Sequence, residues 1–286
     1  MDINSKVQAV FQLEVLDKNL NKKINTVEFP NIVLDQGLER LGYGEVFSYC
    51  RVGTGSSAPD KTQTQLDTQR AATSSVEAES SGINASSGYI WFRKKFRFGT
   101  GAASGNLTEV GVGWSANGTN NLFNRALIRD TQNNPTTVTV LEDEVLDVTV
   151  ELRSYVSLLP TTSSVTISGT VYELKIQSLL SIDRAFNVGY YCTGATGYSG
   201  QIGTYSSGPT GRLDDFGVTN QPYVPGSLKR TFDLYWGLNQ GNAAPLKTVV
   251  CWTPYCAYQV EYSPAIPKTS ETVLRLTQEI TWGRYE

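Results

Sequence analysis

Apolar and polar residues alternate along most of the chain, and this period-two pattern is typical of β-strands with one buried face. The clearest run spans 106–155. Within it, the alternating Val110 and Val112 lead into a turn-like segment around Gly118, and the apolar stretch 122–128 follows as a returning strand. Renewed alternation to the end of the run predicts an antiparallel meander with one solvent-facing side.

Similar alternation predicts further strands over 7–15, 90–98, 165–167, 172–176, 232–238, 248–260 and 274–282. Helical spacing occurs in 31–42, where apolar residues fit one side of a short helix that Asn31 would cap and Gly42 would end. About ten strands and no alternation of strands with helices predict an all-β fold. We expect an antiparallel β-sandwich, one large or two small, with a single short N-terminal helix and long loops.

Two stretches depart from the strand pattern and are interpreted as surface excursions. Residues 60–88 are poor in large apolar side chains, and 184–229 are rich in Gly, Ser, Thr and Tyr. Both are too long for simple hairpin loops. We therefore expect one β-sandwich unit over 1–286 with these two excursions. Two small β domains, 1–158 and 159–286, stay open as the alternative.

The segment 187–229 is interpreted as a contact surface, with a disordered loop as the alternative. Tyrosine offers a large contact area with few rotatable bonds, while Gly and Ser let the backbone adapt to a partner. Disordered segments are usually poor in aromatic residues, and this one is not. The candidate interface residues are Tyr190, Tyr191, Tyr198, Tyr205 and Tyr223.

The charge balance does not indicate nucleic acid or an anionic membrane as a partner, because 24 basic and 27 acidic residues leave a net charge of −3. The densest basic cluster is Arg93, Lys94, Lys95 and Arg97. Its flanking aromatics are typical of single-stranded nucleic-acid sites, but the solvated face of an amphipathic strand is the simpler interpretation. No apolar stretch approaches ~18 residues, and the first residues do not form a signal peptide, so we expect folding in a cytoplasm.

The residue types also argue against a cofactor or a metal. The chain has no histidine, the commonest general base and metal ligand. We expect Cys50, Cys192, Cys251 and Cys256 to be reduced and to pack as small hydrophobes. The last two lack the spacing of a zinc site. The GTGSS turn at 53–57 is too short, and too far from a β-α unit, for a phosphate loop.

Carboxylates are the remaining candidates for catalysis, since glycosidases use two carboxyl groups roughly 5–10 Å apart. The candidates are Glu109, Glu142, Asp143, Glu144, Asp214 and Asp215. The group at 142–144 is interpreted as a solvated turn before a strand, and the pair at 214–215 as part of a Gly-rich loop. We therefore predict no catalytic residue and no enzymatic activity, with a polysaccharide depolymerase as the least favoured alternative.

Several stretches are familiar as a set. LTEVGVGW, LFNRALI and PTTVTVLEDEVLDVTVELRSY occupy 107–114, 122–128 and 135–155, and NIVLDQGLERLG, YCRVGTGSSAP and IPKTSETVLRLTQEITWGR occupy 31–42, 49–59 and 266–284. Together they resemble a family of tailed-bacteriophage virion proteins, usually described as tail fibre or tail-appendage proteins. These stretches read as packing motifs, so the resemblance does not place the protein within a virion.

The resemblance implies a structural component of a tailed-phage virion, assembled in the bacterial host cytoplasm and acting through subunit contacts in a tail fibre, collar or adaptor. Its implied partners are further copies in a symmetric homo-oligomer and other tail or neck proteins. Host surface glycan or protein joins them if the appendage aids attachment. Residues 1–15 and 272–282 are candidates for edge pairing with neighbours. A receptor- or glycan-binding module is the alternative.

Overall fold

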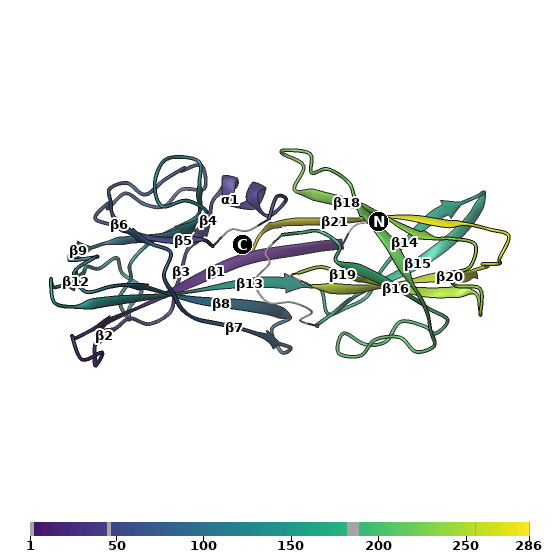
Figure 1. Ribbon diagram of the computed structural model, residues 1–286, viewed down its shortest axis with the longest axis horizontal. Coiled ribbons are helices and arrows are strands. Elements are labelled where there is room, and N and C mark those ends of the chain that lie inside the picture. The colour runs from purple at the N-terminus through teal and green to yellow at the C-terminus, as the bar shows by residue number, and fades with distance from the viewer. Residues whose placement is uncertain (1–2, 45–46, 182–188, 255, 286) are drawn as a thin grey trace. The chain divides into compact units, whose positions relative to one another are not determined.

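The computed structural model describes residues 3–44, 47–181, 189–254 and 256–285 (Figure 1). Strands make up 54% of the chain and helix 2%, which confirms the predicted all-β class. None of the helical residues in these ranges belongs to a helix that is long and apolar enough to cross a membrane.

The chain divides into two compact units, each assembled from separate segments. Unit 1 contains Met1–Lys6, Gly82–Ile90 and Ser154–Gly283, and unit 2 contains Val7–Ser81, Trp91–Arg153 and Arg284–Glu286. The longest segments thus separate between residues 153 and 154, close to the division after 158 that the sequence left open. The short segments 1–6 and 82–90 nevertheless belong with the later part of the chain.

Unit 2 contains most residues of one group of hydrogen-bonded strands, all of a second group and one small pair. The first group has the order β1 (Ile3–Leu16), β13 (Val145–Val156), β8 (Tyr89–Phe98) and β7 (Val76–Asn84), with β2 (Lys22–Asn25) and β3 (Phe29–Pro30) on β1. The second has the order β4 (Ile32–Val33), β11 (Leu122–Leu127), β10 (Glu109–Gly113), β5 (Tyr49–Gly53) and β6 (Gln69–Thr73). The small pair is β9 (Gly105–Leu107) with β12 (Val138–Val140).

Helix α1 (Asp35–Arg40) lies inside the range predicted to be helical, but it starts later than expected. Asn31 does not cap it, because β4 intervenes and the N-cap position is Leu34, whose side chain cannot accept a hydrogen bond. The start is fixed by β11 instead, since the Leu34 N–H donates to the Phe123 carbonyl at 2.9 Å. A Cβ on Gly37 would lie 2.1 Å from the same carbonyl oxygen, so this close approach needs glycine.

The described residues of unit 1 include a run of eight strands in which each neighbouring pair is antiparallel. Their order is β14 (Thr161–Ile167), β15 (Thr170–Leu179), β20 (Ala257–Ile266), β19 (Leu246–Trp252), β16 (Gly194–Tyr198), β17 (Arg212–Asn220), β18 (Lys229–Trp236) and β21 (Leu274–Arg284). Its buried interior includes the large side chains Trp236, Tyr258 and Tyr262.

The two predicted excursions contain strands, which corrects the sequence-based interpretation. Residues 60–88 include β6 and β7, and 184–229 include β16 and β17. β16 was not recognised because its first four residues, 194–197, are small. Its neighbour explains why they are small, since a Cβ on Gly197 would lie 2.2 Å from the ring of Trp236. The large side chain that fills this part of the core therefore comes from β18, far along the sequence.

Candidate functional site

Tyr190 is a core residue and is not available to a partner, contrary to its place among the candidate interface residues. Its side chain is fully buried, and its ring stacks on Trp282 with centroids 4.7 Å apart. Its hydroxyl donates to Ser5 at 2.7 Å. Burial raises the pKa of this hydroxyl, so it stays protonated.

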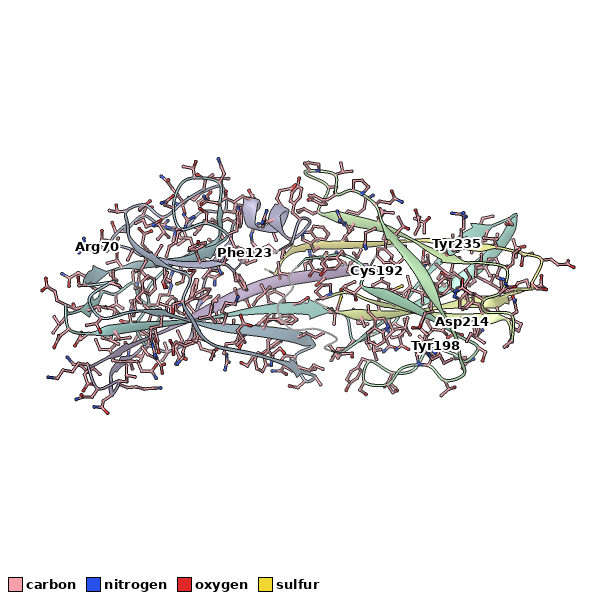
Figure 2. The ribbon with its side chains drawn as sticks, in the orientation of Figure 1. Arg70, Phe123, Cys192, Tyr198, Asp214 and Tyr235 are labelled. Atoms are coloured by element: carbon pink, nitrogen blue, oxygen red, sulfur yellow. The ribbon has the colours of Figure 1, made fainter. Side chains whose placement is uncertain are left out.

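The other four tyrosines of the predicted contact surface, Tyr191, Tyr198, Tyr205 and Tyr223, are half-buried. Tyr198 on β16 packs against a buried cluster of Leu179, Val250 and Ala257 (Figure 2). Tyr223 stacks on Trp282 at 5.7 Å, and its hydroxyl accepts from the Leu228 N–H. Contacts within the chain thus hold the described part of this segment, and its role as an interface stays a prediction. Residues 184–188 lie outside the described ranges.

Asp214 and Asp215 lie in β17 and not in a loop as the sequence suggested. The Asp214 carboxylate accepts from the Gly241 N–H at 3.1 Å. The Asp215 carboxylate accepts from the Thr196 hydroxyl at 2.6 Å and pairs with Arg212 at 2.6 Å. The two carboxylates therefore serve different local partners, and each is explained as a structural hydrogen-bond acceptor.

The acidic turn before β13 is only partly solvated. Glu142 and Asp143 are exposed as expected, but Glu144 is buried, which corrects its interpretation as a solvated residue. Its carboxylate pairs with Lys23 and accepts from the Leu141 N–H at 2.8 Å. The hydrogen bond from Lys23 is the main reason that the pKa of Glu144 is lowered.

Glu109, the remaining carboxylate candidate, is a fully buried structural centre. One oxygen accepts from the backbone N–H groups of Gly55 and Thr68 at 3.0 and 2.8 Å. The other accepts from the Asp67 N–H at 3.0 Å and from Arg125 Nε at 2.9 Å. The three backbone hydrogen bonds hold the chain between β5 and β6 onto β10, and the bond from Arg125 joins β11 to β10.

Arg125 completes this buried centre from β11. Its guanidinium is fully buried, and besides Glu109 it donates to Gln63 at 2.8 Å and to the Ser57 carbonyl at 3.1 Å, and lies 3.2 Å from Asp67. Such a pair is costly to desolvate and stays buried only because each polar atom has a partner. The sequence offered one signal for this pair, namely single charged residues inside otherwise apolar strands.

Arg51 is a second buried cation, held by carbonyl groups and an amide. It donates to the carbonyl oxygens of Ser115, Gly118 and Asn117 at 2.8, 3.1 and 3.2 Å, and also to the Asn121 side chain. Burial lowers its pKa. The guanidinium thus fixes the turn between β10 and β11 by donating hydrogen bonds to its carbonyl groups.

The basic cluster of β8 is paired within unit 2. Arg93 pairs with Glu151 at 2.5 Å, Lys95 with Glu14 at 2.5 Å, and Arg97 bidentately with Asp147 at 2.7 Å; these three acids are buried. Lys94 points to the other face, is itself buried, and pairs with Glu79 at 3.0 Å. A phosphate backbone would have to displace these carboxylates, so the cluster gives no support to nucleic-acid binding.

The four cysteines are buried and free. Burial raises the pKa of Cys50 and Cys251 and raises that of Cys256 to about 11, which keeps these thiols protonated and unreactive. Among the residues that the structure describes, no group of three or more acids or cysteines could hold a metal ion.

An open groove of about 310 Å³ runs across β17, β18 and β21. Its lining includes Asp233, Tyr235, Arg275 and Thr277. Tyr235 is 39% exposed, and the Arg275 guanidinium lies 4.9 Å from the centroid of its ring. Asp233 accepts from the Thr277 hydroxyl at 2.7 Å. An exposed ring beside carboxylate, guanidinium and hydroxyl groups can hold a polar ligand with apolar faces.

The strands expected to pair with neighbouring subunits are interior strands. Both β1 and β21 have a hydrogen-bonded strand on each side. The strand at the open end of the order in unit 1 is β14, which contains the predicted strand 165–167.

Comparison with protein families, with curated proteins and with solved structures finds no match to this chain.

Proposed function

We propose that this chain is a structural component of a tailed-phage virion, a tail fibre, collar or tail-appendage protein that acts through subunit contacts. One observation supports this most: the stretches that resemble the phage family converge on the buried centre of unit 2. LTEVGVGW supplies Glu109, LFNRALI supplies Arg125, and YCRVGTGSSAP supplies Gly55 and Ser57. Residues far apart in sequence thus make one packing motif, as a structural protein requires.

The architecture we propose for unit 2 is a β-sandwich. Its support is that each strand group buries apolar side chains, among them Phe92 and Phe96 on β8 and Val110 and Val112 on β10. A sandwich core has this composition, because the inner faces of both sheets exclude water. Rigid sandwiches suit a virion, where affinity comes from buried area and strand pairing between subunits.

Virions test this proposal directly. We expect the purified protein to form a discrete homo-oligomer or to bind another tail protein, and immunogold labelling to place it on the particle. Mass spectrometry of purified virions provides the control for carry-over from the lysate. A protein that is a monomer at tens of micromolar and absent from virions would contradict the proposal.

The groove at Tyr235 favours a second candidate function, the binding of host surface glycan. A sugar ring could stack on the exposed tyrosine while its hydroxyls bond to Asp233 and Arg275. We expect Tyr235→Ala to reduce binding to host polysaccharide, measured by calorimetry, while Tyr285→Ala on unit 2, also an exposed tyrosine, leaves it unchanged. If the wild-type protein does not bind host polysaccharide, this function is excluded. Release of reducing ends that Asp214→Asn abolishes would favour a depolymerase instead.

A further inference from the structure

β14 presents an open backbone edge, because β15 is its one strand neighbour in the part of the chain that the structure describes. The two strands are joined by a two-residue turn, in which Ser168 and Gly169 have positive φ values of 49° and 82°. Residues flanking such a turn exchange both backbone hydrogen bonds, and bonded pairs alternate along the ladder. The N–H and C=O groups of Thr162, Ser164 and Thr166 therefore point away from β15.

This edge lacks the usual protection against strand pairing. β14 reads TTSSVTI, with no charge and no proline, and its register with β15 has no bulge. Two other edge strands are protected by charge: β7 carries Glu77 and Glu79, and β6 carries Arg70. An uncharged edge without a bulge is a template for another strand unless the protein uses it.

We propose that β14 pairs with the β14 of a second copy of this chain, antiparallel and centred on Ser164. This pairing deepens the proposed function, because it names the surface through which copies of the chain join. The role of the pairing in a virion rests on that proposed function. The pairing sets Ser164 opposite Ser164 and Thr162 opposite Thr166 of the other copy. These pairs are favourable, and no like charges meet, as they would if a charged edge paired with itself.

Apolar surface beside the edge favours the same occupant. Leu159, just before β14, is 76% exposed, and Val171 on β15 is 58% exposed. Val165 and Ile167 are half-buried and line a groove of about 340 Å³. A second hairpin placed along the edge would extend the sheet and bring its own Val165 and Ile167 to the same face, covering surface that is otherwise solvated.

Charge and proline substitutions on the edge test the pairing. Ser164→Lys places two ammonium groups opposite each other, and Ser164→Pro removes an outward N–H without touching the β15 ladder. Ser80→Lys on the exposed β7 edge is the matched control. We expect the wild type and the control to dimerise, and both Ser164 variants to dimerise at least ~10-fold more weakly, by sedimentation equilibrium. Circular dichroism verifies that each variant folds.

A cysteine at the centre of the pair provides a positive readout. Directly opposed residues have Cα atoms about 5.5 Å apart, within disulfide range, so Ser164→Cys should form an interchain disulfide when glutathione disulfide is added. Ser80→Cys should not. The native cysteines are buried and do not compete.

The outcomes of these experiments distinguish failure of the β14 pairing from failure of the proposed function. If the wild type oligomerises and the Ser164 variants do so equally, pairing through β14 is wrong while subunit contacts stand. If the wild type is a monomer yet present in virions, self-pairing is again wrong and the proposed function survives. Loss of dimer in both Ser164 variants, with trapping by Ser164→Cys, supports the pairing.

Discussion

At the scale of single residues, the molecule buries charge where a core ordinarily excludes it. Glu109, Arg125 and Arg51 are fully buried, and their hydrogen bonds go largely to loop backbone. Alternation could predict the strands that carry these residues. It could not pair them, because Glu109 and Arg125 come from different strands, and only the register that sets Glu109 opposite Leu127 brings them together.

Removing one member of the buried pair should be costly. We expect Arg125→Met to lower the free energy of unfolding by about 3–5 kcal/mol, because Glu109 is left as a buried charge without its cation. Arg212→Met also breaks an ion pair, but that pair is exposed, and its loss should cost less than about 1 kcal/mol. Urea unfolding measures both. Equal effects would show that burial does not set the cost.

At the scale of elements, strands with strong alternation were predictable and strands made of small residues were not. β8 was predicted because Phe92 and Phe96 alternate with basic residues. β16 was missed because its share of the core is supplied by Trp236 from β18, a partner that only the fold brings near. The same limit applies to the candidate site. The sequence around Tyr190 is typical of a surface segment, and only the fold brings Trp282 against its ring.

The fit of β16 against Trp236 can be tested with one methyl group. We expect Gly197→Ala to destabilise the protein by about 1–3 kcal/mol, because the added Cβ overlaps the Trp236 ring. Gly208→Ala adds the same methyl group where no atom lies within 4 Å, and should change stability by less than about 0.5 kcal/mol. Thermal unfolding compares the two. A neutral Gly197→Ala would mean that the ring moves freely.

At the scale of the whole molecule, the change of stability with pH from neutrality into acid should come from carboxylates. The chain has no histidine, whose ordinary pKa lies in this range. The pKa values of Glu14, Asp67 and Glu144 are lowered in the folded protein. For Glu14, burial acts to raise the pKa, but hydrogen bonds from Lys22 and Lys95 outweigh it.

Acidification should therefore unfold the protein through these groups. A carboxylate with a lowered folded pKa contributes stability that is complete above its unfolded pKa, and that stability is lost as the pH falls from the unfolded pKa through the folded pKa. We expect the free energy of unfolding to be flat around neutrality and to fall below pH 4.5, the ordinary pKa of glutamate. Glu14→Gln should make that fall shallower, measured by urea unfolding across pH. An unchanged slope would contradict this assignment.

The segmented build of unit 2 has a consequence for how the chain is made. Arg284 donates to the Val33 carbonyl at 2.7 Å and pairs with Asp35, while the Tyr285 N–H donates to the Val7 carbonyl at 2.9 Å. During translation, residues 284 and 285 are synthesised long after Val7, Val33 and Asp35, so these early residues lack the contacts until the chain is nearly complete. A product released before residue 284 lacks these contacts, and proteases can remove it.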